Sequence, residues 1–160
     1  MEVYVFSDRQ LDAMDEWQSA LEAEGFNINL DESRGFVDLS GFLPVNIDGR
    51  PSGFECDHFE AGPVIDELNA EGFPVERRWK YLLAFRFGGS RYECTSALVA
   101  AAIYMRSTDG ILFDCEDGTF HSPENAVAYA RRAADPVAWE DFERFLEEIK
   151  TRGLTQPPPA

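Results

Sequence analysis

The stretch YLLAFRFGGSRYECTSALVAAAIYM (residues 81–105) constrains the fold more than any other, because a strand signal runs directly into a helix signal. Residues 81–87 are rich in aromatic and branched apolar side chains, which predicts a buried strand. Two glycines then form a turn. Ser90 and Glu93 make a capping box, which predicts a helix continuing to about Arg106. A chain with such a unit contains a sheet with helices packed on it.

Similar signals recur along the rest of the chain and predict the order β-α-β-β-β-α-β-α-β-α-α. Ser7 and Gln10 form a second capping box, after a strand at residues 3–6, and predict a helix that ends at Gly25. The segment DGRPSG (residues 48–53) has the composition of a turn between two strands. The remaining expected elements are strands at 26–30, 42–47, 54–59 and 111–114, and helices beginning at Gly62, Ser122 and Asp135.

This order predicts one α+β domain over residues 1–153, with a mixed, largely antiparallel sheet and helices mainly on one face. At 160 residues the chain suits a single core. The last helix is expected to bury an apolar face and to end at Gly153. That face consists of Phe142, Phe145, Leu146 and Ile149. Residues 154–160 (LTQPPPA) have the composition of a disordered, proline-rich tail.

The charge is unevenly distributed along the chain. Residues 1–76 contain eighteen acidic and three basic residues, a net charge of −15, whereas residues 77–160 contain twelve acidic and eleven basic residues, a net charge of −1. Such an asymmetry indicates a directed negative field. Nucleic acids and anionic membranes are therefore excluded as partners, because both would be repelled.

Cysteine usage and hydropathy indicate a soluble, cytoplasmic protein. The three cysteines are widely spaced and form no disulfide framework, which is typical of a reducing compartment. The N-terminal residues carry no signal-peptide pattern. The longest apolar run, residues 97–105, has nine residues, about half of the ~20 that span a bilayer.

The segment SGFECDHFEAG (residues 52–62) gathers side chains that could bind a metal. In a strand, Phe54, Cys56 and His58 share one face, which we interpret as the core face. A zinc site at Cys56 and His58 would need two more ligands, and the spacing supplies none. Cys94, one turn into its helix, is the candidate catalytic thiol, but it lies in the apolar series of that helix. We therefore expect no metal, cofactor or catalytic residue.

The acidic surface remains as the functional feature. Aromatic residues are threaded through the acids, a combination typical of protein interfaces with a charged rim. The candidate partner-binding residues are Asp12, Asp15, Glu16, Phe54, Glu55, Asp57, Phe59, Glu60, Asp66, Glu67 and Glu71.

Two segments carry a resemblance to a known class of proteins. The block FRFGGSRYECTSALVAAAIYMRSTDGILFDCEDGTF (residues 85–120), with S-G-F-E at residues 52–55, resembles small bacterial immunity proteins of polymorphic and contact-delivered toxin systems. The similarity covers about a third of the chain and contains no catalytic signature. It implies a protein that binds and blocks a cognate toxin, such as a nuclease or a deaminase, through that toxin's basic cleft.

The sequence thus predicts a non-enzymatic acidic binding protein whose partner is a cognate basic protein, a toxin or effector domain. Two alternatives stay open: a small cysteine- or metal-dependent enzyme using Cys94 or Cys56 and His58, and an adaptor or chaperone for a secreted effector.

Overall fold

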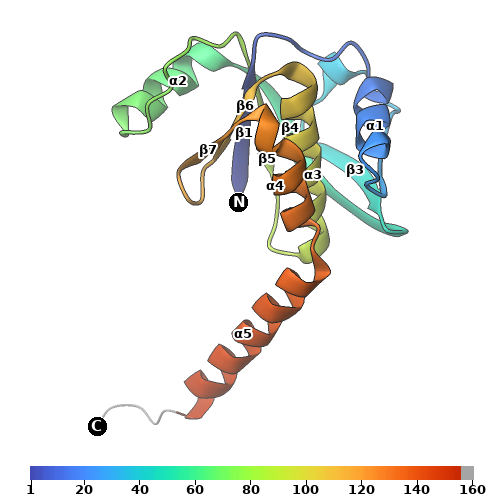
Figure 1. Ribbon diagram of the computed structural model, residues 1–160, viewed down its shortest axis with the longest axis vertical. Helices are drawn as coiled ribbons and strands as arrows, with labels where there is room; N and C mark the ends of the chain where they lie inside the picture. Colours follow the sequence, from blue (N-terminus) through green and yellow to red (C-terminus); the bar gives the residue numbers. More distant parts are fainter. Residues whose placement is uncertain (156–160) are drawn as a thin grey trace.

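The computed structural model describes residues 1–155 (Figure 1). In chain order its elements are β1 (Glu2–Ser7), α1 (Met14–Ala23), β2 (Ile28–Leu30), β3 (Phe42–Ile47), β4 (Arg50–Glu60), α2 (Ala61–Ala70), β5 (Tyr81–Arg86), α3 (Arg91–Thr108), β6 (Ile111–Asp114), β7 (Thr119–His121), α4 (Ala126–Ala133) and α5 (Pro136–Thr155). Two short 3₁₀ turns occur at Phe36–Asp38 and Pro123–Asn125.

The seven strands form one sheet in the order β2-β3-β4-β5-β1-β6-β7, and every neighbouring pair is antiparallel. The predicted α+β class is confirmed, with β7 as an additional short strand. The turn in DGRPSG is shorter than expected: Asp48 and Gly49 alone form it, both with positive φ, and Arg50 already pairs with Ile47. A two-residue turn of this kind matches the twist of antiparallel strands.

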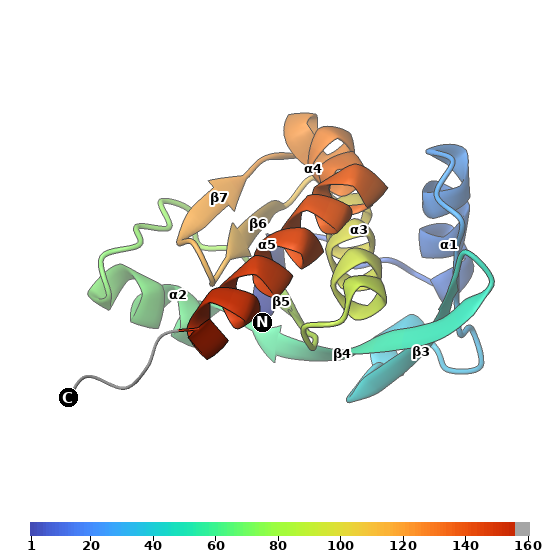
Figure 2. The same ribbon diagram turned by 90° about the horizontal axis from the view of Figure 1, so that it is seen from below.

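The first face of the sheet is covered by α1, α3 and α4 (Figure 2). Alternate strand residues such as Val5, Phe54 and Phe85 point into this layer and are fully buried. The alanine-rich α3 can lie close to the sheet because its side chains are short. Ser90 accepts a hydrogen bond from the Glu93 backbone N–H and caps α3, as predicted.

The second face of the sheet is covered at one end only. There α2 and the segment after it pack Ile65, Leu68 and Trp79 against Phe6 and Leu82. The other end, where the first residues of β1 and the last residues of β5 meet the middle of β4, carries no helix. One half of this face is therefore open.

The start of the first helix differs from the prediction. Ser7 does not cap it, because β1 continues through Ser7, which pairs with Tyr81, and the Ser7 hydroxyl donates to the Arg9 carbonyl oxygen at 2.7 Å. The helix begins at Met14, and its N-cap residue Ala13 offers no side-chain acceptor. The chain needs these extra residues to cross from the middle of the sheet to the far edge.

The expected burial of the last helix is wrong. Phe142, Phe145, Leu146 and Ile149 are 48%, 56%, 38% and 50% exposed. The reason is geometric: α5 extends away from the body of the domain, and only its first turn contacts the core (Figure 1).

The end of α5 also differs from the sequence prediction. The helix continues past Gly153 to Thr155, so the expected tail at 154–160 overlaps it, and residues 156–160 lie outside the described part of the chain. Within residues 1–155, no helix is long and apolar enough to cross a bilayer.

Candidate functional site

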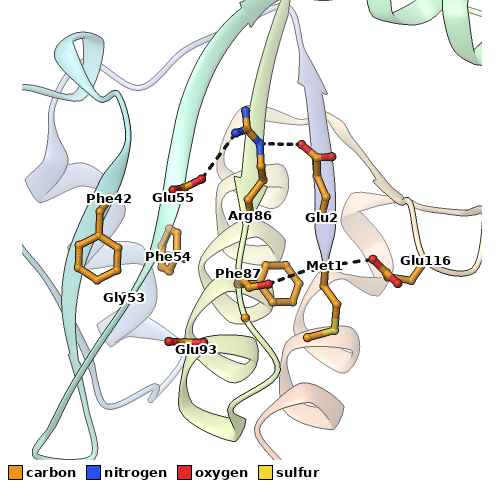
Figure 3. A pocket seen from close by; sticks show the side chains of 11 residues that line it. Met1, Glu2, Phe42, Gly53, Phe54, Glu55, Arg86, Phe87, Glu93 and Glu116 are labelled. Carbon is orange, nitrogen blue, oxygen red and sulfur yellow. Dashed lines mark hydrogen bonds and ion pairs between the residues drawn. The ribbon is translucent and has the colours of Figure 1, made fainter.

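A hollow of about 560 Å³ lies at the open half of the second face, and we call it the acidic hollow (Figure 3). It extends past the start of β1 and the end of β5 to the start of α3 and to the turn after β6. Its lining residues are Met1, Glu2, Phe42, Gly53, Phe54, Glu55, Arg86, Phe87, Gly88, Glu93 and Glu116.

An exposed aromatic ring forms one wall of the acidic hollow. Phe42, at the start of β3, is 55% exposed, and its ring lies over Gly53 of β4. A Cβ atom at Gly53 would collide with this ring and would lie 2.7 Å from the Leu43 carbonyl oxygen. Glycine at this position therefore lets the phenyl ring lie flat against the sheet, where its outer face meets solvent.

Arg86 lies at the centre of a group of carboxylates on the open face. The register sets Arg86 directly opposite Glu2 on one side and Glu55 on the other. Its guanidinium nitrogens lie 3.0 Å from Glu2, 3.6 Å from Glu55 and 3.7 Å from Asp57 (Figure 3 draws the first two). The hydrogen bond to Glu2 is the main cause that raises the Arg86 pKa.

Negative charge exceeds positive charge around the acidic hollow. Four carboxylates line it, from Glu2, Glu55, Glu93 and Glu116, against the Arg86 guanidinium and the Met1 ammonium group. The ammonium group lies 3.9 Å from Glu116 and donates to the Phe87 carbonyl oxygen at 3.1 Å. The acidic hollow therefore has a formal charge of −2 and suits a cationic group bound beside an aromatic ring.

The structure brings together two of the predicted partner-binding residues at this site. Glu55 lines the acidic hollow, and Asp57 lies next to it, where its carboxylate also accepts hydrogen bonds from Ser40 Oγ at 3.0 Å and the Gly41 N–H at 2.9 Å. Phe54 requires a correction: it faces the core and is 1% exposed, so it cannot act as a surface anchor. Phe59 is exposed on the same strand as Glu55, farther toward α2.

The other predicted residues form two separate groups. Asp12, Asp15 and Glu16 lie at the start of α1, whereas Glu60, Asp66, Glu67 and Glu71 lie on and around α2. Figures 1 and 2 both place α1 and α2 on opposite sides of the sheet-containing body. Some of these acids are also paired within the chain, Glu16 with Arg9 and Asp66 with Arg78. One compact partner footprint cannot include both groups.

The cysteine and histidine candidates are buried or hydrogen-bonded within the domain. Cys56 is fully buried, and burial raises its pKa strongly. The His58 ring lies 2.8 Å from the Phe36 carbonyl oxygen and 3.3 Å from Gln10. Burial raises the pKa of Cys94 to about 11, so desolvation outweighs any effect of its helix N-terminus. Within residues 1–155 no cluster of three or more Asp, Glu, His or Cys side chains could hold a metal ion.

Four lining residues of the acidic hollow were not predicted from the sequence: Phe42, Arg86, Glu93 and Glu116. Arg86 could have been singled out from the sequence, because it is a charged residue in the otherwise apolar strand YLLAFRF. The other three come from separate elements and meet only through the strand register and the approach of α3, neither of which a local pattern encodes.

No family model matches the chain, and no curated protein or solved structure is significantly similar to it. The chemistry of the site therefore rests on its own geometry.

Proposed function

We propose that this chain is a non-enzymatic binding protein of the immunity type, which neutralises a bacterial toxin domain by covering its basic active-site cleft. The observation that supports this most is the acidic hollow, where a net negative charge and an exposed phenyl ring share an uncovered sheet surface. An arginine or lysine side chain of the toxin would enter the acidic hollow, stack on Phe42 and pair with Glu55 and Glu93.

The charge distribution supports the same proposal at longer range. The −15 charge of residues 1–76 draws a cationic protein toward the half of the chain that contributes β1, β3 and β4. Such steering raises association rates by about 10- to 10³-fold at low ionic strength. The acidic hollow then fixes the orientation, because Arg86 holds the carboxylates of β1 and β4 in place before the partner arrives.

Co-expression tests this proposal. The basic C-terminal domain of a secreted protein encoded beside this chain is expressed with and without it, and growth of the host is measured. We expect the wild-type chain to restore growth. The double variant Glu55→Gln/Glu93→Gln should lose protection, and its association rate, measured by surface plasmon resonance, should fall by about tenfold at low salt.

The matched control is Asp12→Asn/Asp15→Asn, which removes the same charge at the start of α1, away from the acidic hollow. This control should protect as well as the wild type does. Equal loss in both variants would contradict a localised site. Tight binding without restored growth would instead identify an adaptor or chaperone for the secreted protein, which would use the same surface.

A further inference from the structure

The helix α5 presents an apolar seam that lies uncovered by the described chain beyond its first residue, Trp139. Trp139, Phe142, Leu146 and Ile149 follow one another at spacings of three, four and three residues, the a and d positions of a heptad repeat. The exposed fractions of the last three, 48%, 38% and 50%, show that this seam faces solvent. With twenty residues the helix is about 30 Å long.

The first residue of the seam, Trp139, is anchored to the body of the domain. The Trp139 indole Nε1–H donates to the Ala133 carbonyl oxygen at 3.0 Å, and the rings of Trp139 and Phe142 meet edge to face at 6.1 Å. A largely apolar hollow of about 280 Å³ lies beside them, lined also by Arg132, Ala133 and Ala138. The start of α5 is therefore tied to the core, and its apolar stripe projects from the domain in a defined direction.

The other face of α5 is polar and exposed to solvent. Glu140, Asp141, Glu147 and Glu148 occupy the b and c positions, away from the seam. Intrahelical ion pairs join Arg144 to Asp141 at 3.2 Å and Lys150 to Glu147 at 3.0 Å. A helix with one apolar stripe and one charged face is stable when the stripe is covered by another helix.

Charge favours a second copy of this chain as the covering helix. α5 carries five acidic and three basic residues, a net charge of −2, so two copies repel each other far less here than at the half of the chain that carries −15. The e positions beside the seam hold Glu143 and Lys150, which have opposite signs.

These two residues also decide the orientation. When two such helices run antiparallel with Leu146 level with Ile149 of the second copy, Glu143 lies beside Lys150 of the second copy, and twofold symmetry creates the pair twice. In a parallel arrangement Phe145, at a g position, would lie beside Lys150 of the second copy. These positions would then form no pair of opposite charges.

We propose that α5 is a homodimerisation helix, which pairs with α5 of a second copy as a short antiparallel coiled coil. Leu146 and Ile149 form the centre of the apolar interface, Phe142 flanks it at each end, and Glu143 and Lys150 set its direction. The two acidic hollows stay free, because they lie on the sheet and not on α5. The proposal does not depend on the immunity function, since it concerns a separate surface.

Sedimentation equilibrium of the full chain tests this proposal. We expect the mass to rise from 18.0 kDa toward twice that value between about 10 µM and 1 mM. Leu146→Glu should raise the dimer dissociation constant at least about a hundredfold, because it buries a charge in the seam. Val37→Glu, at a residue 66% exposed outside α5, is the matched control and should leave the dissociation constant unchanged.

Charge exchange tests the direction of the helices. Glu143→Lys alone should raise the dissociation constant about tenfold, and adding Lys150→Glu should restore it, because both cross pairs return with their signs reversed. Failure of the second change to restore dimerisation would overturn the antiparallel arrangement.

A wild-type chain that stays monomeric across this range would overturn the dimer itself. Strong protection of α5 backbone amides from hydrogen exchange in that monomer would indicate that the helix folds back on its own domain. Far-UV circular dichroism confirms that each variant is folded, which we expect because the altered side chains lie outside the core.

Discussion

Replacing Trp17 with alanine is expected to lower the free energy of unfolding by about 3–5 kcal/mol. Trp17 is fully buried between α1, α3 and the sheet, and its ring meets those of Phe36 and Phe85 edge to face at 6.0 and 5.9 Å. Its indole Nε1–H donates to the Ala100 carbonyl oxygen at 3.0 Å. The substitution creates a cavity and also removes the hydrogen bond that this oxygen accepts from the indole, so two costs add.

Urea denaturation followed by circular dichroism measures this effect. Trp139→Ala is the control, because Trp139 is only partly buried at the base of α5 and should cost about 1–2 kcal/mol. A Trp17→Ala loss no larger than that of the control would show that α1 is not an integral part of the core.

Replacing Arg86 with glutamate is expected to cost about 1–3 kcal/mol at neutral pH, although the site is on the surface. The substitution removes the cation shared by Glu2, Glu55 and Asp57. It also sets a fourth carboxylate directly opposite two of them, and like charges across neighbouring strands repel.

The dependence on salt distinguishes this electrostatic cost from lost packing. Added salt screens both the attraction of Arg86 to the carboxylates in the wild type and the repulsion between carboxylates in the variant. The stability difference at pH 7 should therefore shrink as salt is added. Arg86→Met keeps much of the apolar stem and should show a smaller difference. A difference that stays constant as salt is added would contradict the carboxylate cluster.

The sequence predicted the elements well where the signal is local. The Ser90 cap of α3 and the alternating burial of β4 both depend on neighbouring residues, and the structure confirms each. Ser7 shows the limit of such a pattern. Ser7 and Gln10 have the residue types and spacing of a capping box. Ser7 nevertheless stays in a strand, because it pairs with Tyr81 of β5, which is far away in the sequence.

Burial and the site were harder to predict because both depend on tertiary packing. The periodicity of Phe142 and Leu146 correctly indicates an amphipathic helix, but periodicity does not say whether a core lies beside it. The charge split between the two halves drew attention to Glu55 and Asp57 together with many other acidic residues. It could not separate them from the acids of α1 and α2, because only the folded sheet sets these groups in different parts of the molecule.

The most direct test of the proposed function is a titration of the ¹⁵N-labelled protein with a tetra-arginine peptide, followed by amide chemical shifts at low salt. We expect the largest shifts around the acidic hollow, at Phe42, Glu55, Arg86 and Glu93, and their loss when salt is added. A tetraglutamate peptide should produce none. Shifts spread equally over α1, α2 and the sheet, or centred on α1, would contradict a binding site at the open half of the second face.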